Sequence, residues 1–112
     1  METTIVNLTA EEFDEYIGRG REYHTHMLTE GNRPGEEGWL GNPHPIGWCD
    51  ICNSYHTRSE CVKKFKEDFY KKIEAESEFK KAVLSLVGKR LGCFCKPKEC
   101  HGDIIKEWIK LS

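Results

Sequence analysis

Six cysteines in two short groups constrain this chain of 112 residues more than any other feature. The first group is CDICNSYHTRSEC (residues 49–61) and the second is CFCKPKECHGD (residues 93–103). Each group combines cysteines with a histidine, and the first lies in a polar stretch that gives little other reason for cysteine. We therefore expect metal or thiol chemistry in this chain.

The start of the chain, METTIVNLTAEEF, has neither a basic leader nor an apolar stretch of signal-peptide length. No later run approaches the length that spans a membrane. We therefore expect a cytoplasmic protein. In that reducing compartment a disulfide framework is disfavoured, which leaves the cysteines for metal or thiol chemistry.

Length and charge limit the architecture and the partners. With 112 residues and 38% apolar content, the chain can fill one small core, so we expect a single domain over residues 1–112. The 17 basic and 19 acidic side chains give a net charge of -2. This charge provides no general attraction to nucleic acid or to an anionic membrane, so recognition of a phosphate must be local.

The first half of the chain predicts two strands and a long loop. TIVNL (residues 4–8) is rich in β-branched residues, and a second strand is expected around residues 15–17, after a helical turn capped by Thr9. Glycines flank Arg19, so the backbone can turn there and bring the guanidinium beside the strand end. Residues 21–47 are rich in Gly, Pro and Asn and predict a long loop.

The second half predicts helices around one strand. Val62, Phe65, Phe69 and Ile73 recur at helical spacing, and ESEFKKAVLSLV (residues 76–87) predicts a second helix. RLGCFC (residues 90–95) predicts a strand, followed by a final helix in a strand-loop-helix unit over residues 89–111. This order predicts a small α/β domain with a partly parallel sheet of three to four strands flanked by helices.

The first cysteine group predicts a zinc site. Cys49 and Cys52 form a C-x2-C pair, and His56 and Cys61 complete four ligands of the kind that a closed tetrahedral site needs. Four protein ligands leave no position for water, so one structural Zn²⁺ per chain would staple the loop at about residues 48–61. The alternative is an idle or redox-active C-x2-C pair, with a buried Cys61 and a surface His56.

The second group leaves three interpretations open. Cys93, Cys95, Cys100 and His101 supply ligands for a second zinc site, although the adjacent Cys100 and His101 must both bend toward one ion. A catalytic or ligand-binding pocket would use Cys100 or Cys95 as the thiol and His101 as the acid-base group, with Asp103 orienting His101. The cysteines would otherwise be structural and buried.

Four segments together resemble a family catalogued as domain of unknown function 4326, which occurs in bacteria and often in phages. They are YIGRG (residues 16–20), LGNP (residues 40–43), HTRSECVKKF (residues 56–65) and GKRLGCFCKPKECHGDII (residues 88–105). The resemblance implies a metal staple in a variable loop and, for a phage protein, the host cytoplasm. It also implies a shared functional surface, formed by Arg19, Asn42, Cys95, Cys100, His101 and Asp103.

In this chain His44 follows the LGNP segment, where the family more usually has an aromatic residue, and it is a further candidate polar group for the pocket. The resemblance implies architecture rather than a particular reaction.

These observations favour a site for a nucleotide or another phosphate-containing ligand. It should lie where the strand RLGCFC meets the last helix, near Arg19 and Asn42, because open α/β sheets bind ligands beyond their strand ends. As an enzyme, the protein would act on a nucleotide or sugar phosphate through Cys100 and His101. The alternative is a phage-type interaction module that captures a nucleotide or a host protein through residues 39–48 without turnover. Contact with nucleic acid is disfavoured by the charge.

Overall fold

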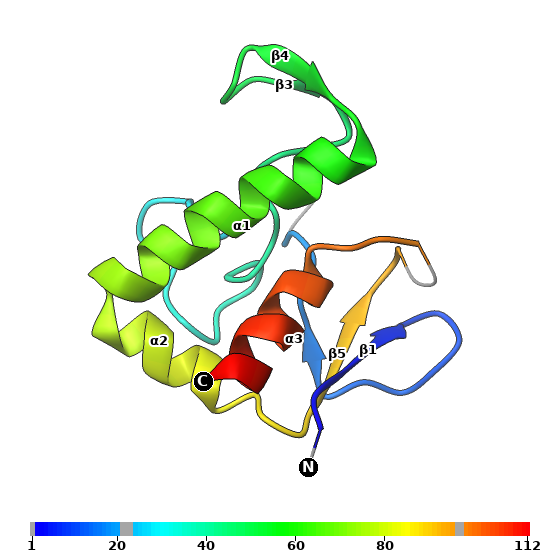
Figure 1. The fold of residues 1–112 in the computed structure, drawn as a ribbon, viewed down its shortest axis with the longest axis vertical. Coiled ribbons are helices and arrows are strands. Elements are labelled where there is room, and N and C mark those ends of the chain that lie inside the picture. Colours follow the sequence, from blue (N-terminus) through cyan, green and yellow to red (C-terminus); the bar gives the residue numbers. More distant parts are fainter. Residues whose placement is uncertain (1, 21–23, 96–97) are drawn as a thin grey trace.

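Three short parallel strands form the central sheet. The computed structural model describes residues 2–20, 24–95 and 98–112. β5 (Arg90–Cys93) lies between β1 (Thr4–Asn7) and β2 (Glu15–Tyr16). Leu91 is in register with Ile5 on one side and with Glu15 on the other, so the carboxyl ends of the strands meet at one edge (Figure 1). The predicted α/β class with a parallel sheet is confirmed.

The described residues form three helices: α1 (Arg58–Ala75), α2 (Ser77–Leu84) and α3 (Gly102–Leu111). Of these, α3 packs against β1 of the sheet, and α2 packs against both α1 and α3. α1 begins at a capping box, in which Thr57 and Glu60 satisfy each other's backbone N–H groups. The side chains predicted to form its apolar stripe are buried: Val62, Phe65, Phe69 and Ile73. No helix in the described part of the chain is both long and apolar enough to cross a membrane.

The turn after β1 differs from the prediction. Asn7 Oδ1 accepts hydrogen bonds from the Thr9 backbone N–H (2.9 Å) and from the Thr9 hydroxyl (2.6 Å). Asn7 therefore caps this turn and Thr9 supplies donors, because an Asn side chain readily bonds to the backbone two residues on.

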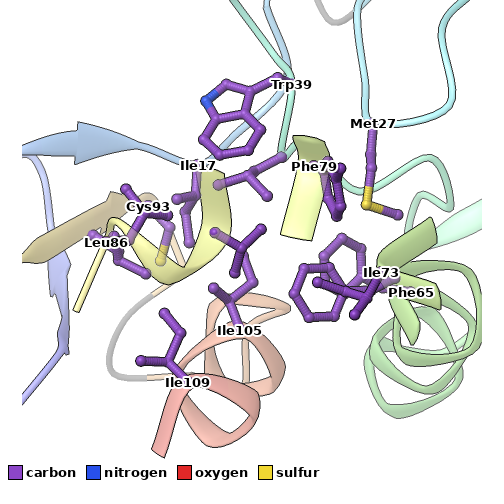
Figure 2. Packing of buried hydrophobic residues seen from close by; sticks show 14 of the residues in the cluster. Ile17, Met27, Trp39, Phe65, Ile73, Phe79, Leu86, Cys93, Ile105 and Ile109 are labelled. Carbon is purple, nitrogen blue, oxygen red and sulfur yellow. The ribbon is translucent and has the colours of Figure 1, made fainter. Parts of the chain in front are cut away.

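The core joins the sheet, the helices and part of the predicted long loop. Figure 2 shows side chains from all of these segments turned toward one another. Phe65 stacks on Phe69 with 5.4 Å between ring centroids, and Phe79 meets Phe69 edge-on at 5.9 Å. Met27 and Trp39 from the loop are buried in the same cluster. The loop is thus anchored to the core; its residues 21–23 lie outside the described residues.

A hairpin follows the loop, where sequence analysis predicted no strands. β3 (Gly47–Cys49) and β4 (Ser54–His56) pair antiparallel, and the turn between them reverses at Asn53, whose φ of 55° is left-handed. The hairpin stands at the end where α1 begins, apart from the parallel sheet (Figure 1). It carries Cys49, Cys52 and His56 from the first cysteine group.

Candidate functional site

Four side chains from the hairpin and the preceding loop converge into one cluster: His44, Cys49, Cys52 and His56. Their ligand atoms lie within 4.8 Å of one another. His44 Nδ1 is 3.5 Å from Cys49 Sγ and 3.4 Å from Cys52 Sγ. Within residues 2–20, 24–95 and 98–112, no other group of three or more His, Cys, Asp or Glu side chains comes as close. This cluster is a candidate metal site.

The hairpin itself brings three of these ligands together. His56 pairs with Gly47 and Cys49 with Ser54, so Cys49 and His56 share one face of the hairpin. Trp48 and Tyr55, which pair directly, share the opposite face, where their rings meet with 5.1 Å between centroids. Cys52 lies in the turn.

The surroundings of the two histidines fit a metal ion. Asp68 Oδ2 lies 2.5 Å from His44 Nε2, so this carboxylate accepts the Nε2–H and leaves Nδ1 facing the two thiols. Metal-binding histidines usually have such a carboxylate or carbonyl partner on the second nitrogen. His56 Nε2 is buried and has no hydrogen-bond partner among the described residues, which is unfavourable unless an ion binds it. The donors, two thiols and two imidazoles, suit Zn²⁺.

Cys61, predicted as the fourth ligand, lies outside this cluster, and His44 takes its place. The Cys61 thiol donates to the His44 carbonyl oxygen (2.7 Å) and accepts from Asn42 Nδ2 (3.1 Å). Burial raises the pKa of Cys61 to about 11, so this side chain stays a protonated donor near neutral pH. Cys61 therefore holds the backbone of His44, which takes its place in the candidate cluster.

A cavity of about 410 Å³ adjoins the cluster at the carboxyl ends of β2 and β5. Six of the residues that the sequence predicted for a pocket line it: Arg19, Asn42, His44, Cys95, Cys100 and His101. Sequence reasoning missed other lining residues, which include Tyr16, Ile46, Arg58 and Phe94. His44 lines the cavity and also belongs to the metal cluster. The two sites are therefore neighbours that share a wall.

Arg19 and Asn42 shape this shared wall. Arg19 donates from Nε to the Asn42 carbonyl oxygen (2.7 Å) and from a terminal nitrogen to the Pro43 carbonyl oxygen (2.7 Å). The side chain of Asn42 accepts from the His44 backbone N–H (2.9 Å) and donates to the Cys61 carbonyl oxygen (3.2 Å). Burial lowers the pKa of Arg19. Both residues hold the loop, and their role in binding a ligand stays a prediction.

Cys100 and His101 are buried in the cavity wall, in an environment that disfavours a thiolate. The Cys100 thiol donates to Cys93 Sγ at 3.1 Å, and this bond, together with burial, raises the pKa of Cys100 far above that of an ordinary cysteine. His101 Nε2 lies 2.7 Å from the Ile17 carbonyl oxygen, and burial lowers the pKa of the ring. A neutral ring that donates from Nε2 leaves Nδ1 3.8 Å from Cys100 Sγ.

The remaining predicted residues divide between the cavity and the helix. Cys95 is half-buried and lines the cavity. Asp103 is not among the described residues that line it; Asp103 Oδ2 accepts from the Cys100 backbone N–H (3.2 Å) in the first turn of α3. Cys93, Cys95, Cys100 and His101 do not converge as a ligand group among the described residues, as the second zinc site, one of the three interpretations left open, would require.

The parallel sheet, the hairpin and the Cys/His cluster define a small α/β domain with a candidate metal site. The chain belongs to the family described as a domain of unknown function, DUF4326, which matches residues 5–111. A relative in Enterobacteria phage T4, the "uncharacterized 12.4 kDa protein in nrdA-td intergenic region", is 47% identical over 49 residues. These are 44% of this chain and 45% of the relative, so the chain spans less than half of the relative's length. No solved structure matches the chain.

Proposed function

We propose that this protein is a zinc-stapled domain that binds a nucleotide or another small phosphate-containing ligand in the cavity beside the metal site. The observation that carries the proposal is the cavity at the carboxyl edge of the sheet, which two arginines line. The loop that supplies His44 to the metal cluster also forms part of the cavity wall. The metal would therefore have a structural role, fixing the loop against which the ligand binds.

The donor set supports zinc in a closed structural site. Two thiols and two imidazoles make four ligands, which satisfy tetrahedral Zn²⁺ and leave no position for a reactive water. Cys49, His44 and His56 are buried, so an ion there would be shielded from solvent. Binding would release the thiol protons and stabilise the hairpin.

Titration with Co²⁺ under reducing conditions tests the metal site, because Co²⁺ gives visible absorption bands that depend on its geometry and ligands. The expected result is saturation at one equivalent with a tetrahedral spectrum and a thiolate charge-transfer band, which Zn²⁺ then abolishes. Cys49→Ser should lose this spectrum, whereas Cys93→Ser should keep it. Saturation at two equivalents, or an octahedral spectrum, would contradict the proposal.

Local charge supports a phosphate-containing ligand. The cavity volume of about 410 Å³ lies in the range of roughly 300 to 1,000 Å³ found for small-molecule sites. Arg58, the first residue of α1, is half-buried at the cavity and donates to the Glu99 carbonyl oxygen (3.1 Å). A guanidinium has five N–H donors, so one such bond leaves others for a phosphate. Recognition of this local kind is compatible with the net charge of -2.

Calorimetric titration with inorganic phosphate and with ribose 5-phosphate tests the ligand. Arg58→Ala should weaken binding about tenfold, because it removes one charge-assisted contact. Lys63→Ala is the matched control, since Lys63 is an exposed cation on the same helix that does not line the cavity. Equal affinities in both variants, or no binding of either compound, would contradict the proposal.

The cavity wall favours binding over turnover. The buried Cys100 thiol has a raised pKa and is occupied as a donor to Cys93, so it is a poor nucleophile. His101 is neutral, and its Nε2 is directed at the Ile17 carbonyl oxygen. We therefore prefer a binding module to the enzyme that Cys100, His101 and Asp103 would otherwise form.

The outward face of the hairpin favours a second candidate function, an interaction module for a host protein or nucleic acid. Trp48 and Tyr55 are 46% and 75% exposed on that face. Binding of a single-stranded oligonucleotide that weakens with rising salt, and that Tyr55→Ser abolishes, would favour nucleic acid. Binding that does not change with salt would argue against a phosphate-driven contact.

A further inference from the structure

We infer that the ligand of this cavity is a nucleotide whose base lies against the ring of Phe94. The inference rests on the proposed function. It adds that the cavity recognises the flat aromatic base of the ligand as well as its phosphate. It assigns a specificity-determining role to Phe94, which lies between two cysteines of the second group and was not among the residues predicted for the pocket.

The first observation is the exposure of Phe94. This residue follows the last residue of β5, lines the cavity and is 58% exposed. The preceding residue, Cys93, ends the strand and is buried, so the chain becomes exposed where β5 ends. A large aromatic ring left open at the rim of a cavity is a surface on which a planar apolar group can bind.

The second observation is that the position of this ring is fixed by the sheet. Tyr16 ends β2 and pairs with Gly92 of β5, so the residues after both strands meet at the same edge. The rings of Tyr16 and Phe94 meet edge to face, with 6.3 Å between centroids and an interplanar angle of 77°. The Tyr16 hydroxyl in turn donates to the Arg19 carbonyl oxygen (3.0 Å). The aromatic pair is thereby tied to the segment that carries a cavity guanidinium.

The third observation is that apolar and cationic groups line one cavity. Ile46 is 52% exposed and lines it together with Phe94, while Arg58 supplies the positive charge. A sugar phosphate without a base would leave both apolar side chains in water. A nucleotide would cover them, because each of the four bases has a flat face that can stack on an aromatic ring.

The test compares ligands that differ only in the base. Calorimetric titrations would use the four common ribonucleoside monophosphates, ribose 5-phosphate, and the nucleosides without phosphate. At least one mononucleotide should bind about tenfold more tightly than ribose 5-phosphate, the size expected for stacking of one base. Phe94→Leu, which keeps an apolar side chain at this exposed position, should remove this preference, and Phe94→Tyr should restore it.

Phe13→Leu is the matched control, because it makes the same change at an aromatic ring that is 42% exposed but does not line the cavity. If ribose 5-phosphate binds as tightly as every mononucleotide, the inference is overturned while the phosphate proposal stands. If the nucleosides bind as tightly as the mononucleotides, the phosphate proposal fails while the stacking on Phe94 stands. If no compound binds, both fail.

Discussion

The two nitrogens of the His44 ring have different surroundings, and this difference explains why His44 belongs to the cluster. Nε2 is held by Asp68 at 2.5 Å, and Nδ1 faces the thiols of Cys49 and Cys52. The backbone of His44 is held as well, by the side chain of Asn42 and by the thiol of Cys61. Two of these contacts come from α1, so a rigid element positions His44.

We expect Asp68→Asn to weaken Zn²⁺ binding by about 10-fold to 100-fold, because it replaces the carboxylate that orients the His44 ring. Competition with a chromophoric chelator would measure the change. Glu67→Gln is the control, since Glu67 is the exposed neighbour of Asp68 on α1. Unchanged affinity in Asp68→Asn would show that His44 is not a ligand or needs no orientation.

The raised pKa of Cys100 also gives a prediction for a single residue. A raised pKa favours the protonated thiol, so at pH 8 the reactive thiolate is rarer than for an ordinary cysteine. We expect iodoacetamide to modify Cys100 at least about tenfold more slowly in the native protein than in urea, because one pKa unit is a tenfold change in thiolate. Peptide mass spectrometry after timed quenching would measure both rates.

Cys93→Ala separates the hydrogen bond from burial, because it removes the acceptor of the Cys100 thiol. Modification of Cys100 should be faster in that variant than in the native protein. Rapid modification of native Cys100 at pH 8 would contradict this prediction and would favour Cys100 as the nucleophile that the sequence suggested.

Among the elements, the β3–β4 hairpin is the one that we expect to depend most on a metal. Each strand has three residues, and an isolated two-stranded hairpin is marginally stable in water. One face carries the exposed rings of Trp48 and Tyr55, while the other carries the candidate ligands Cys49 and His56. Little apolar burial is therefore available to hold it, and an ion would supply the missing stability.

We expect chelation of the metal to release the hairpin and the preceding loop without unfolding the sheet. Amide hydrogen exchange should accelerate over residues 44–57, and protection in β5 and α3 should stay within about a factor of two, as expected of separate local opening. Mass spectrometry of peptic peptides with and without chelator would show this pattern. Unchanged exchange in the hairpin would contradict a metal staple, as would loss of protection throughout the chain.

At the scale of the whole molecule, the periodic segments predicted most of the fold. The apolar spacing of Val62, Phe65 and Phe69 predicted α1. All three parallel strands were predicted close to where they lie, at residues 4–8, 15–17 and 90–95. From these, the carboxyl edge of the sheet and a pocket beside it followed. The hairpin could not be predicted, because strands of three residues are too short to show alternation against a background of Gly, Pro and Asn.

The place of His44 in the cluster was also beyond prediction, for a tertiary reason. Cys61 and His44 lie on opposite sides of the hairpin in sequence, and both are ordinary zinc ligands. Only the packing of the loop against α1 directs the His44 ring toward Cys49 and Cys52, and it leaves the Cys61 thiol on the His44 carbonyl. Spacing alone cannot distinguish these arrangements.

One loop connects the two sites of the molecule. Arg19, from the segment after β2, holds the carbonyls of Asn42 and Pro43, and the next residue, His44, belongs to the metal cluster. The cavity and the candidate metal site are therefore parts of one structural unit, and we expect His44 to complete it as a zinc ligand.

Elemental analysis of purified variants tests directly whether His44 is a zinc ligand. After dialysis against a weak chelator, the wild type and Cys61→Ser should each hold one zinc per chain, whereas His44→Ala should hold little or none. Circular dichroism of α1 and the other helices would confirm that each variant is folded. One zinc per chain in His44→Ala, together with loss of zinc in Cys61→Ser, would show that Cys61 and not His44 is the ligand.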